Sequence, residues 1–199
     1  MAYSSAFEQW KSTLSRIFVP ISIGPLGPGE FRGSVTDVEF DRFGMSVVMS
    51  SPQRVWRTPR QIARPGKEYL VALVPTAGGC LFEQRGRVAI AVPGSITFCD
   101  TSRPFTCRSE RWSESVIVRA PLAQILDGTG LSGTELPTAI AVPGDGAVGV
   151  VTRFFADLAE LHTADIDLAI GMAEHGAGLL NSAVLLAADQ YGTRHTVDI

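Results

Sequence analysis

The sequence predicts a mainly β protein with C-terminal helices, and two observations carry that prediction. From about residue 20 to about residue 120, short β-branched or apolar runs alternate with turns rich in proline and glycine. The turn signals recur about every 8–12 residues, which is typical of a sandwich or a closed barrel. After Pro121, apolar residues recur at spacings of three and four, which indicates helices. We therefore expect a jelly-roll type β-barrel followed by an antiparallel helix pair.

The N-terminal segment, residues 1–19, is expected to form an amphipathic helix that packs on the barrel. Its apolar residues fall on one side of a helix: Phe7, Trp10, Leu14, Ile17 and Phe18. The segment has scattered charge and no continuous apolar block, so it does not resemble a signal peptide. No apolar run in the chain approaches the ~20 residues that a membrane-spanning helix needs. We expect a cytoplasmic protein.

Two short segments in the barrel region, residues 20–120, predict tight hairpin turns. They are Ala77-Gly78-Gly79 and Arg85-Gly86-Arg87. In both, glycine can supply the positive φ that a tight turn requires.

The helical region, residues 121–192, ends in a helix that we expect from about 165 to about 191. Its main apolar seam repeats at spacings of four and three: Ile166, Ile170, Ala173, Ala177, Leu180, Val184, Ala187 and Tyr191. A second apolar stripe consists of Leu168, Met172, Leu179 and Leu186. A helix with two stripes has two surfaces to cover. We predict a homodimer through the main seam, and deep burial within one domain is the alternative.

A glycine motif precedes the helical hairpin. Residues Gly144–Gly149 match the G-x-G-x-x-G pattern of dinucleotide-binding turns. That function needs a parallel strand after the helix that the motif opens. The sequence predicts a further helix there, and Pro143 lies at the junction before the motif. We interpret the glycines as a flexible connection and a helix start.

Composition argues against a nucleic-acid surface and against a disulfide scaffold. The 199 residues carry a net charge of −3, so the chain as a whole lacks the basic footprint of a DNA-binding protein. Its cysteines, Cys80, Cys99 and Cys107, are odd in number and are not spaced as C-x-x-C. That pattern fits a reduced setting. We interpret each cysteine as a small buried hydrophobic residue, with a redox sensor as the alternative.

The barrel region suggests a cupin-like barrel without a metal. Metal-binding cupins place several histidines and a carboxylate inside the barrel, but His162, His175 and His195 all follow it here. We therefore expect no metal and no cofactor. A Ser-His-Asp site needs a histidine near a nucleophile, and His162 is expected at a helix end, where a cation is favoured for structural reasons alone. Glu83, Glu110 and Glu114 are spread over hairpins, where carboxylates usually face solvent. We expect no catalytic residues.

Candidate ligand contacts in the barrel are aromatic residues with one carboxylate. The candidates are Trp56, Tyr69, Glu83, Phe98 and Trp112. Aromatic rings would supply flat apolar walls, and the carboxylate would orient a ligand. Strand parity is ambiguous in this region, so each of these residues could also be core or surface.

The chain resembles the N-terminal regulatory domain of AraC-family transcription regulators, in the branch with an AraC-binding-like domain. The resemblance rests on PGSITFCDTSRPF at residues 93–105, supported by VWRTPRQIA, EQRGRVAI and VRAPLAQIL elsewhere in the chain. It implies a metal-free cupin-like barrel that binds a small-molecule effector, followed by helices that form a dimer. It also implies a DNA-binding domain of two helix-turn-helix motifs after this chain, with residues 193–199 as the start of the linker.

Two other functions remain open from the sequence. One is a small metal-free enzyme of the cupin type, such as an isomerase. The other is a pure dimerisation module whose barrel is filled by side chains. The barrel interior distinguishes them, because a sensor needs a cavity with a few polar groups, whereas an enzyme needs an acid and a base near one point.

Overall fold

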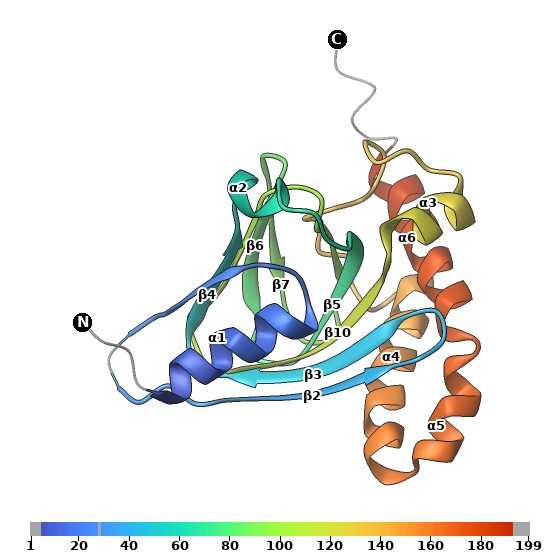
Figure 1. Ribbon diagram of the computed structural model, residues 1–199. Coiled ribbons are helices and arrows are strands. Elements are labelled where there is room, and N and C mark those ends of the chain that lie inside the picture. The colour runs from blue at the N-terminus through green and yellow to red at the C-terminus, as the bar shows by residue number, and fades with distance from the viewer. Residues whose placement is uncertain (1–4, 28, 193–199) are drawn as a thin grey trace.

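The computed structural model describes residues 5–27 and 29–192, and its barrel consists of two five-stranded antiparallel sheets (Figure 1). The first sheet has the order β1 (Ser22–Pro25), β4 (Gln53–Arg57), β9 (Phe105–Ser109), β6 (Cys80–Gln84), β7 (Arg87–Ala91). The second sheet has the order β2 (Gly33–Glu39), β3 (Gly44–Ser50), β10 (Ser113–Pro121), β5 (Tyr69–Ala77), β8 (Thr97–Asp100). The predicted fold class, a cupin-like jelly-roll barrel with C-terminal helices, is confirmed.

Helices cover the outer face of the second sheet. They are α3 (Leu122–Thr129), α4 (Ala147–Ala164), α5 (Ile166–Ala173) and α6 (Gly176–Gly192). Val116, Val118 and Ala120 of β10 join Phe155 of α4 and Leu180 of α6 in one buried apolar cluster. A four-residue helix, α2 (Pro59–Ile62), lies at the end of the barrel and begins with a capping box between Thr58 and Gln61.

The N-terminal helix, α1 (Ser5–Ile17), packs against the barrel as predicted, and Phe7, Trp10 and Leu14 on its apolar side are buried. Figure 1 shows α1 lying across the barrel on the side away from α3–α6. None of the helices in the described part of the chain is both long and apolar enough to cross a membrane.

Both predicted hairpin turns are present, and both contain residues with positive φ. Gly78 has φ 72° between β5 and β6, while Arg85 (φ 56°) and Gly86 (φ 75°) form the turn between β6 and β7. A Cβ atom at Gly78 would lie 2.5 Å from the carbonyl oxygen of Trp112. Glycine is therefore required there both for backbone conformation and for space.

The long C-terminal helix of the prediction is divided in two, and its main seam is the core of the chain itself. The chain turns at Glu174 and His175, and Gly176 then begins α6 with its Cα facing the Phe43 ring, where a Cβ atom would lie 2.5 Å from Cε1. The buried seam residues are Ala173, Ala177, Leu180, Val184 and Ala187; Tyr191 is partly buried against the same cluster. Ala177 and Ala187 let α6 lie close to its neighbouring helices. Because the seam residues from Ala173 to Ala187 are buried within the chain, they are not available to a second subunit.

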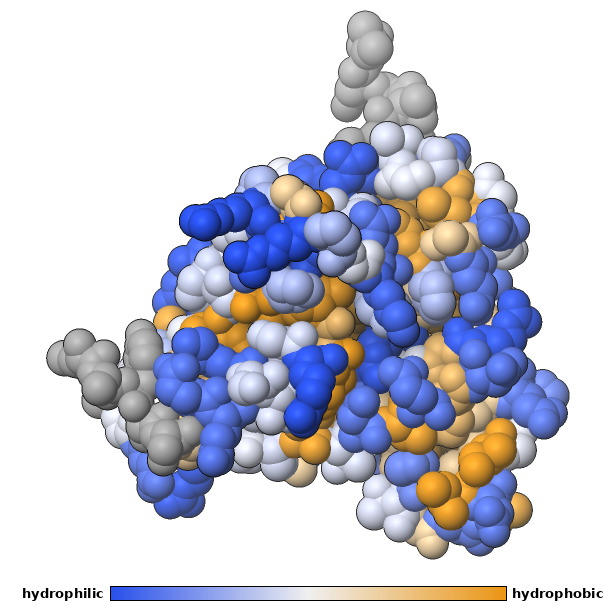
Figure 2. All heavy atoms as spheres, in the orientation of Figure 1, coloured by the Kyte–Doolittle hydropathy of each residue, from blue (hydrophilic) through white to orange (hydrophobic). Residues whose placement is uncertain are grey.

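The exposed apolar residues of this region lie mainly on α5. Ile166 and Ile170 from the predicted seam are 54% and 52% exposed, and Leu168 and Met172 from the second stripe are 61% and 46% exposed. Leu186 on α6 is also exposed. Figure 2 shows apolar side chains gathered on the surface over α5, at the lower right. If the helices contact another subunit, this α5 surface, rather than the main seam, is the part that is free to do so.

Two of the three glycines of the G-x-G-x-x-G match, Gly144 and Gly149, serve close packing. Gly146 is the N-cap of α4. A Cβ atom at Gly149 would overlap the carbonyl oxygen of Gly144, and one at Gly144 would overlap that of Gly94. After α4 the described chain continues into α5 and α6, so the motif is not part of a βαβ unit. The predicted linker at residues 193–199 lies outside the described residues.

Candidate ligand-binding cavity

A cavity of about 130 Å³ lies between the two sheets and under α1. Strands of both sheets line it with Val48, Ser50, Gln53, Val55, Val71, Leu73, Cys80, Phe82, Cys99, Thr101, Phe105, Cys107, Ser109, Ser113, Ser115 and Ile117. Leu14, Phe18, Val19 and Ile21 complete the wall from α1 and the segment after it. Figure 2 shows apolar side chains in a recess on this side of the barrel, next to α1.

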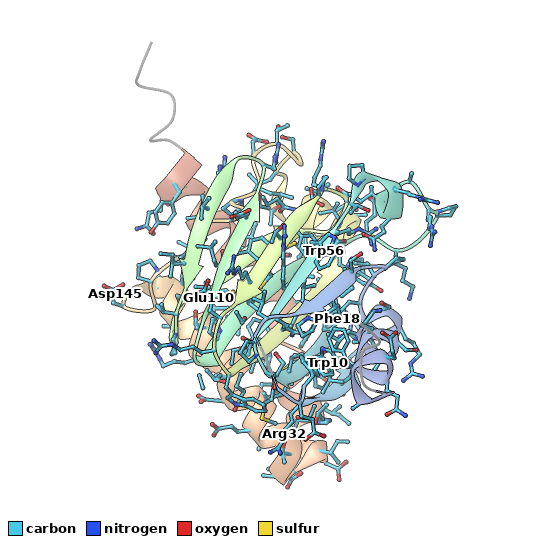
Figure 3. The ribbon with its side chains drawn as sticks, turned by 90° about the vertical axis from the view of Figure 1, so that its left-hand side faces the viewer. Trp10, Phe18, Arg32, Trp56, Glu110 and Asp145 are labelled. Atoms are coloured by element: carbon cyan, nitrogen blue, oxygen red, sulfur yellow. The ribbon has the colours of Figure 1, made fainter. Side chains whose placement is uncertain are left out.

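Helix α1 is fixed to the barrel by one buried hydrogen bond in addition to its apolar contacts. The indole Nε1 of Trp10 donates to Gln53 Oε1 at 2.8 Å, and Gln53 Nε2 donates to Ser50 Oγ at 2.9 Å. Gly33 in β2 leaves room for the Trp10 ring, because a Cβ atom there would lie 2.9 Å from it. Figure 3 shows Trp10 and Phe18 between α1 and the barrel. The helix is thus a wall of the cavity and is held by a side chain that also lines it.

One end of the cavity is polar. The β3–β4 and β9–β10 hairpins meet there, and strand pairing sets Ser113 opposite Ser50 and Ser109 opposite Gln53. All four are buried. Ser115, the next inward-facing residue of β10, extends this group toward the apolar middle of the cavity. Buried hydroxyl and amide groups need hydrogen-bond partners, so their collection around one cavity end is informative.

The opposite end of the inner face of β10 carries a charged cluster. The guanidinium of Arg119 donates to Asp37 at 2.7 and 3.1 Å, to Glu39 at 2.5 Å and to Ser46 at 2.9 Å. Its Cζ atom lies 5.6 Å from the centre of the Phe18 ring. Arg119 is only 1% exposed, and the carboxylates of Asp37 and Glu39 neutralise it. Phe18 therefore lies between this ion cluster and the cavity.

The three cysteines all line the cavity, and two of them have raised pKa values. Burial raises the pKa of the Cys99 thiol well above its usual range, and the neighbouring Asp100 adds to this effect. A hydrogen bond with Cys80, followed by burial, raises the pKa of Cys107. Both thiols are therefore protonated at neutral pH, which suppresses nucleophilic chemistry. The interpretation of the cysteines as small buried residues agrees with the positions of Cys80 and Cys99, whereas Cys107 is only partly buried.

None of the five predicted ligand contacts lines this cavity. Glu83 is exposed on the outer face of β6, and Trp112 is 49% exposed in the β9–β10 turn. Trp56 points to the outer face of β4, where the Arg54 guanidinium lies 5.4 Å from its ring; Figure 3 shows it apart from Trp10 and Phe18. Tyr69 lines a separate surface groove, and Phe98 is buried in the cluster under the helices.

For Glu83, Phe98 and Trp56 the difference is one of strand parity. In β6 the inward residue is Phe82 and not Glu83; in β8 it is Cys99 and not Phe98; and in β4 it is Val55 and not Trp56. A usable signal was present in β10, where Ser113, Ser115 and Ile117 lie on the cavity side and Val116 and Val118 lie on the opposite side under the helices. The two serine hydroxyls in an otherwise apolar stretch indicate a polar cavity wall, because successive side chains of a strand point to opposite faces.

The described residues provide no arrangement for metal binding. Within 5–27 and 29–192, no three His, Cys, Asp or Glu side chains are grouped so that they could hold a metal ion. The cavity lining contains no carboxylate, histidine, lysine or arginine among those residues. The geometry therefore favours binding by apolar contact and neutral hydrogen bonds.

Comparison with known proteins agrees with this arrangement. The family model of the AraC-binding-like domain matches residues 10–186. The "uncharacterized protein in nit 5′ region" of Bacillus sp. strain OxB-1 is 27% identical over 120 residues, which cover 60% of this chain and 46% of that protein.

Among solved structures, the AraC-like transcriptional activator CuxR has a TM-score of 0.72 at 13% identity, covering 89% of this chain and 65% of that one. A cupin domain of an XRE-family regulator from Enterobacter cloacae has a TM-score of 0.36 at 15% identity, covering 44% of this chain and 95% of that one. The chain spans less than two thirds of the length of the Bacillus protein and of CuxR. With a family match over most of its length, the chain belongs to the AraC-binding-like domain family.

Proposed function

We propose that this chain is the effector-sensing and dimerisation domain of an AraC-type transcription regulator, with a small-molecule effector bound in the barrel cavity. The observation that carries the proposal is a partly enclosed, largely apolar cavity in a domain of this family, walled on one side by a helix. Concave sites of this kind, with a few polar groups among apolar walls, are the usual form of small-molecule sites.

The cavity also distinguishes the proposal from the two other functions. A module that only dimerises needs a filled barrel, whereas this barrel contains about 130 Å³ of free space. A metal-free enzyme needs an acid and a base at one point, and the described lining supplies serine, threonine and glutamine side chains and two thiols whose pKa values are raised. This lining favours a binding domain over an enzyme.

The homodimer is proposed to form through α5. The exposed apolar residues Ile166, Leu168, Ile170 and Met172 lie together on this short helix, and exposed apolar clusters of this kind commonly mark interaction sites. A symmetric pair would suit a regulator that binds paired DNA half-sites. DNA contact is proposed to belong to a helix-turn-helix domain beyond residue 199, because this chain has a net charge of −3.

A mass measurement by light scattering tests the dimer. The variant Leu168→Glu/Met172→Glu should be a folded monomer, because the charges would be desolvated in the interface. The control variant Val88→Glu/Ile90→Glu changes a second exposed apolar pair, on β7, and should remain a dimer. If the control variant is a monomer and the α5 variant is still a dimer, the interface lies on β7 and not on α5.

A reporter assay tests sensing. The chain is fused to a DNA-binding domain that represses a reporter only when paired, and small neutral compounds are added. Repression by the fusion that changes on addition of a compound supports the proposal. The purified chain is also titrated with xenon and followed by NMR, since xenon is a general probe of apolar cavities. The proposal is contradicted if no compound changes the repression and xenon does not enter the cavity.

A further inference from the structure

We propose that the cavity is selective for an uncharged molecule of about the size of one aromatic ring, bearing a single polar group that lies against Ser109, Ser113, Ser115 and Gln53. The inference deepens the proposed function and rests on it: the cavity must admit a ligand. It adds the chemical class of that ligand and the direction in which it lies.

The size of the ligand follows from the volume of the cavity. The free space is about 130 Å³. For comparison, an engineered apolar cavity of about 150 Å³ in another protein binds benzene, so the space here corresponds to a molecule of about one ring. A nucleotide is several times larger than this space and would need α1 or the Phe82 and Phe105 side chains to move; the two rings stack with their centres 5.7 Å apart.

The polar group is matched by hydroxyls that line the cavity. Among the described residues, no protein group is hydrogen-bonded to the hydroxyls of Ser109, Ser113 and Ser115, and these hydroxyls are not sealed from the space of the cavity. Gln53 uses one amide hydrogen for Ser50 and its oxygen for Trp10, which leaves a second amide hydrogen free. The polar end therefore offers several donors and acceptors within the space of one small functional group.

The absence of charge on the ligand follows from the lining. No ionisable side chain other than the cysteines lines the cavity in the described chain, and Cys99 and Cys107 are protonated at neutral pH. In the nearest ion cluster the one cation, Arg119, is already paired with two carboxylates, Asp37 and Glu39, and Phe18 separates the cluster from the cavity. A carboxylate or ammonium ligand would lose its hydration without gaining an opposite charge, which is strongly unfavourable.

The orientation of the ligand follows from the distribution of polar and apolar residues. Val71, Leu73, Phe82 and Phe105 supply the apolar side, and Leu14 and Phe18 close it from α1. Thr101 carries the only hydroxyl on that side among the described lining residues, and it is already bonded to the backbone of Tyr69 as donor at 3.0 Å and as acceptor at 2.7 Å. The ring therefore lies among these apolar groups, and the polar group points to the serine end.

Three probes of nearly equal shape test the inference on the wild-type chain: benzamide, benzoate and toluene, titrated at pH 7.5 and followed by ¹H–¹⁵N NMR. We expect benzamide to bind at least tenfold more tightly than benzoate and about fivefold more tightly than toluene. For benzamide, the largest changes in chemical shift should occur at residues of the β3–β4 and β9–β10 hairpins. The inference is overturned if benzoate binds as tightly as benzamide. It is also overturned if toluene, which has no polar group, binds as tightly as benzamide.

The variant Ser109→Ala/Ser113→Ala identifies the residues responsible. It should weaken benzamide binding about fivefold to tenfold, the effect of one or two lost hydrogen bonds, and leave toluene binding unchanged or improved. Ser102→Ala, at a turn outside the cavity, is the matched control and should not change either affinity. Equal loss for benzamide and toluene means that the serines act on the fold and not on the polar group, which contradicts the inference.

The outcomes separate this inference from the proposed function. If none of the three probes binds but xenon enters the cavity, the ligand class is wrong and the sensing proposal stands. If xenon is also excluded, both fail. The comparison of the three probes uses only the wild-type chain, so it decides the question even if the serine variant does not fold.

Discussion

The two faces of the second sheet have the same strands and opposite roles. On the outer face, Val116 and Val118 of β10 and Phe98 of β8 are fully packed under α4 and α6. On the inner face of the same strands, Ser115, Ile117 and Cys99 border a cavity. Close packing on one face makes the sheet rigid, so that the other face can leave space without collapse. The cavity on the inner face therefore depends on the helices that pack against the outer face.

The largest expected effect comes from breaking the outer face through α6. Leu180→Glu/Val184→Glu places two carboxylates at positions that are both 0% exposed and have no basic partner in the cluster. Burying unpaired charges costs several kcal/mol each, comparable to the whole stability of a domain. We expect an unfolded or aggregated chain by circular dichroism.

The matched control for this prediction is the exposed pair on the neighbouring helix. Leu168→Glu/Met172→Glu changes residues that are 61% and 46% exposed. We expect this variant to stay folded and to keep the circular dichroism spectrum of the wild type. If the Leu180→Glu/Val184→Glu variant is instead a folded monomer, the main seam is the dimer interface, and α6 is not part of the core.

These helices also show what the sequence could and could not predict. The spacing correctly predicted helical structure after Pro121. It could not indicate the packing partner, because Ala177 and Ala187 permit close approach to the same chain as well as to a second one. The break before Gly176 had a local signal, a glycine, but the requirement for space beside Phe43 depends on a contact 133 residues away in the chain.

The cavity was less predictable than the fold for a related reason. An alternating pattern reveals the inward face of a strand only when the outward face is solvated. In β8 all four residues are buried because helices cover one face and the barrel the other, so Phe98 and Cys99 look alike in the sequence. Where the outer face is solvated, as at Glu83, the polarity of the residue itself indicated its exposure, and the choice of Glu83 as a contact was avoidable.

A second prediction compares these two neighbours directly. Phe98→Ala should lower the free energy of unfolding by about 3–5 kcal/mol, because a ring is removed from a packed cluster. Cys99→Ala should cost about 1 kcal/mol, because the small thiol already borders free space. Urea denaturation of both variants measures the difference. Similar losses would mean that the inner face is packed as tightly as the outer one.

A third, smaller effect concerns the attachment of α1 to the inner face. Trp10→Phe removes the hydrogen bond to Gln53 and leaves a buried amide oxygen without its partner. We expect a loss of about 1–2 kcal/mol in the free energy of unfolding. The control Trp112→Phe changes an indole that is 49% exposed and should remain within about 0.5 kcal/mol of the wild type. Equal effects of the two changes would show that α1 is held by apolar contacts alone.

The smallest effect is a pH dependence that only the inner face can produce. The folded-state pKa of Cys99 is raised above its ordinary value of 9.0 by burial, so above about pH 9 the unfolded chain releases a proton that the folded chain keeps. The folded state then holds more protons, and linkage requires its stability to fall as pH rises, by at most about 1.4 kcal/mol per pH unit for each such thiol.

The measurement is a series of urea midpoints between pH 7 and pH 10 for the wild type and for Cys99→Ala. The contribution of Cys99 is complete below the unfolded-state pKa and is lost as the pH rises toward the folded-state pKa, so the two curves should run parallel near pH 7 and converge above pH 9. Cys107, whose pKa is raised by its hydrogen bond with Cys80 and by burial, remains in the variant and keeps part of the slope. Curves that stay parallel to pH 10 would mean that the Cys99 thiol is solvated in the folded chain, and the cavity would then hold water at its apolar side as well as at its serine end.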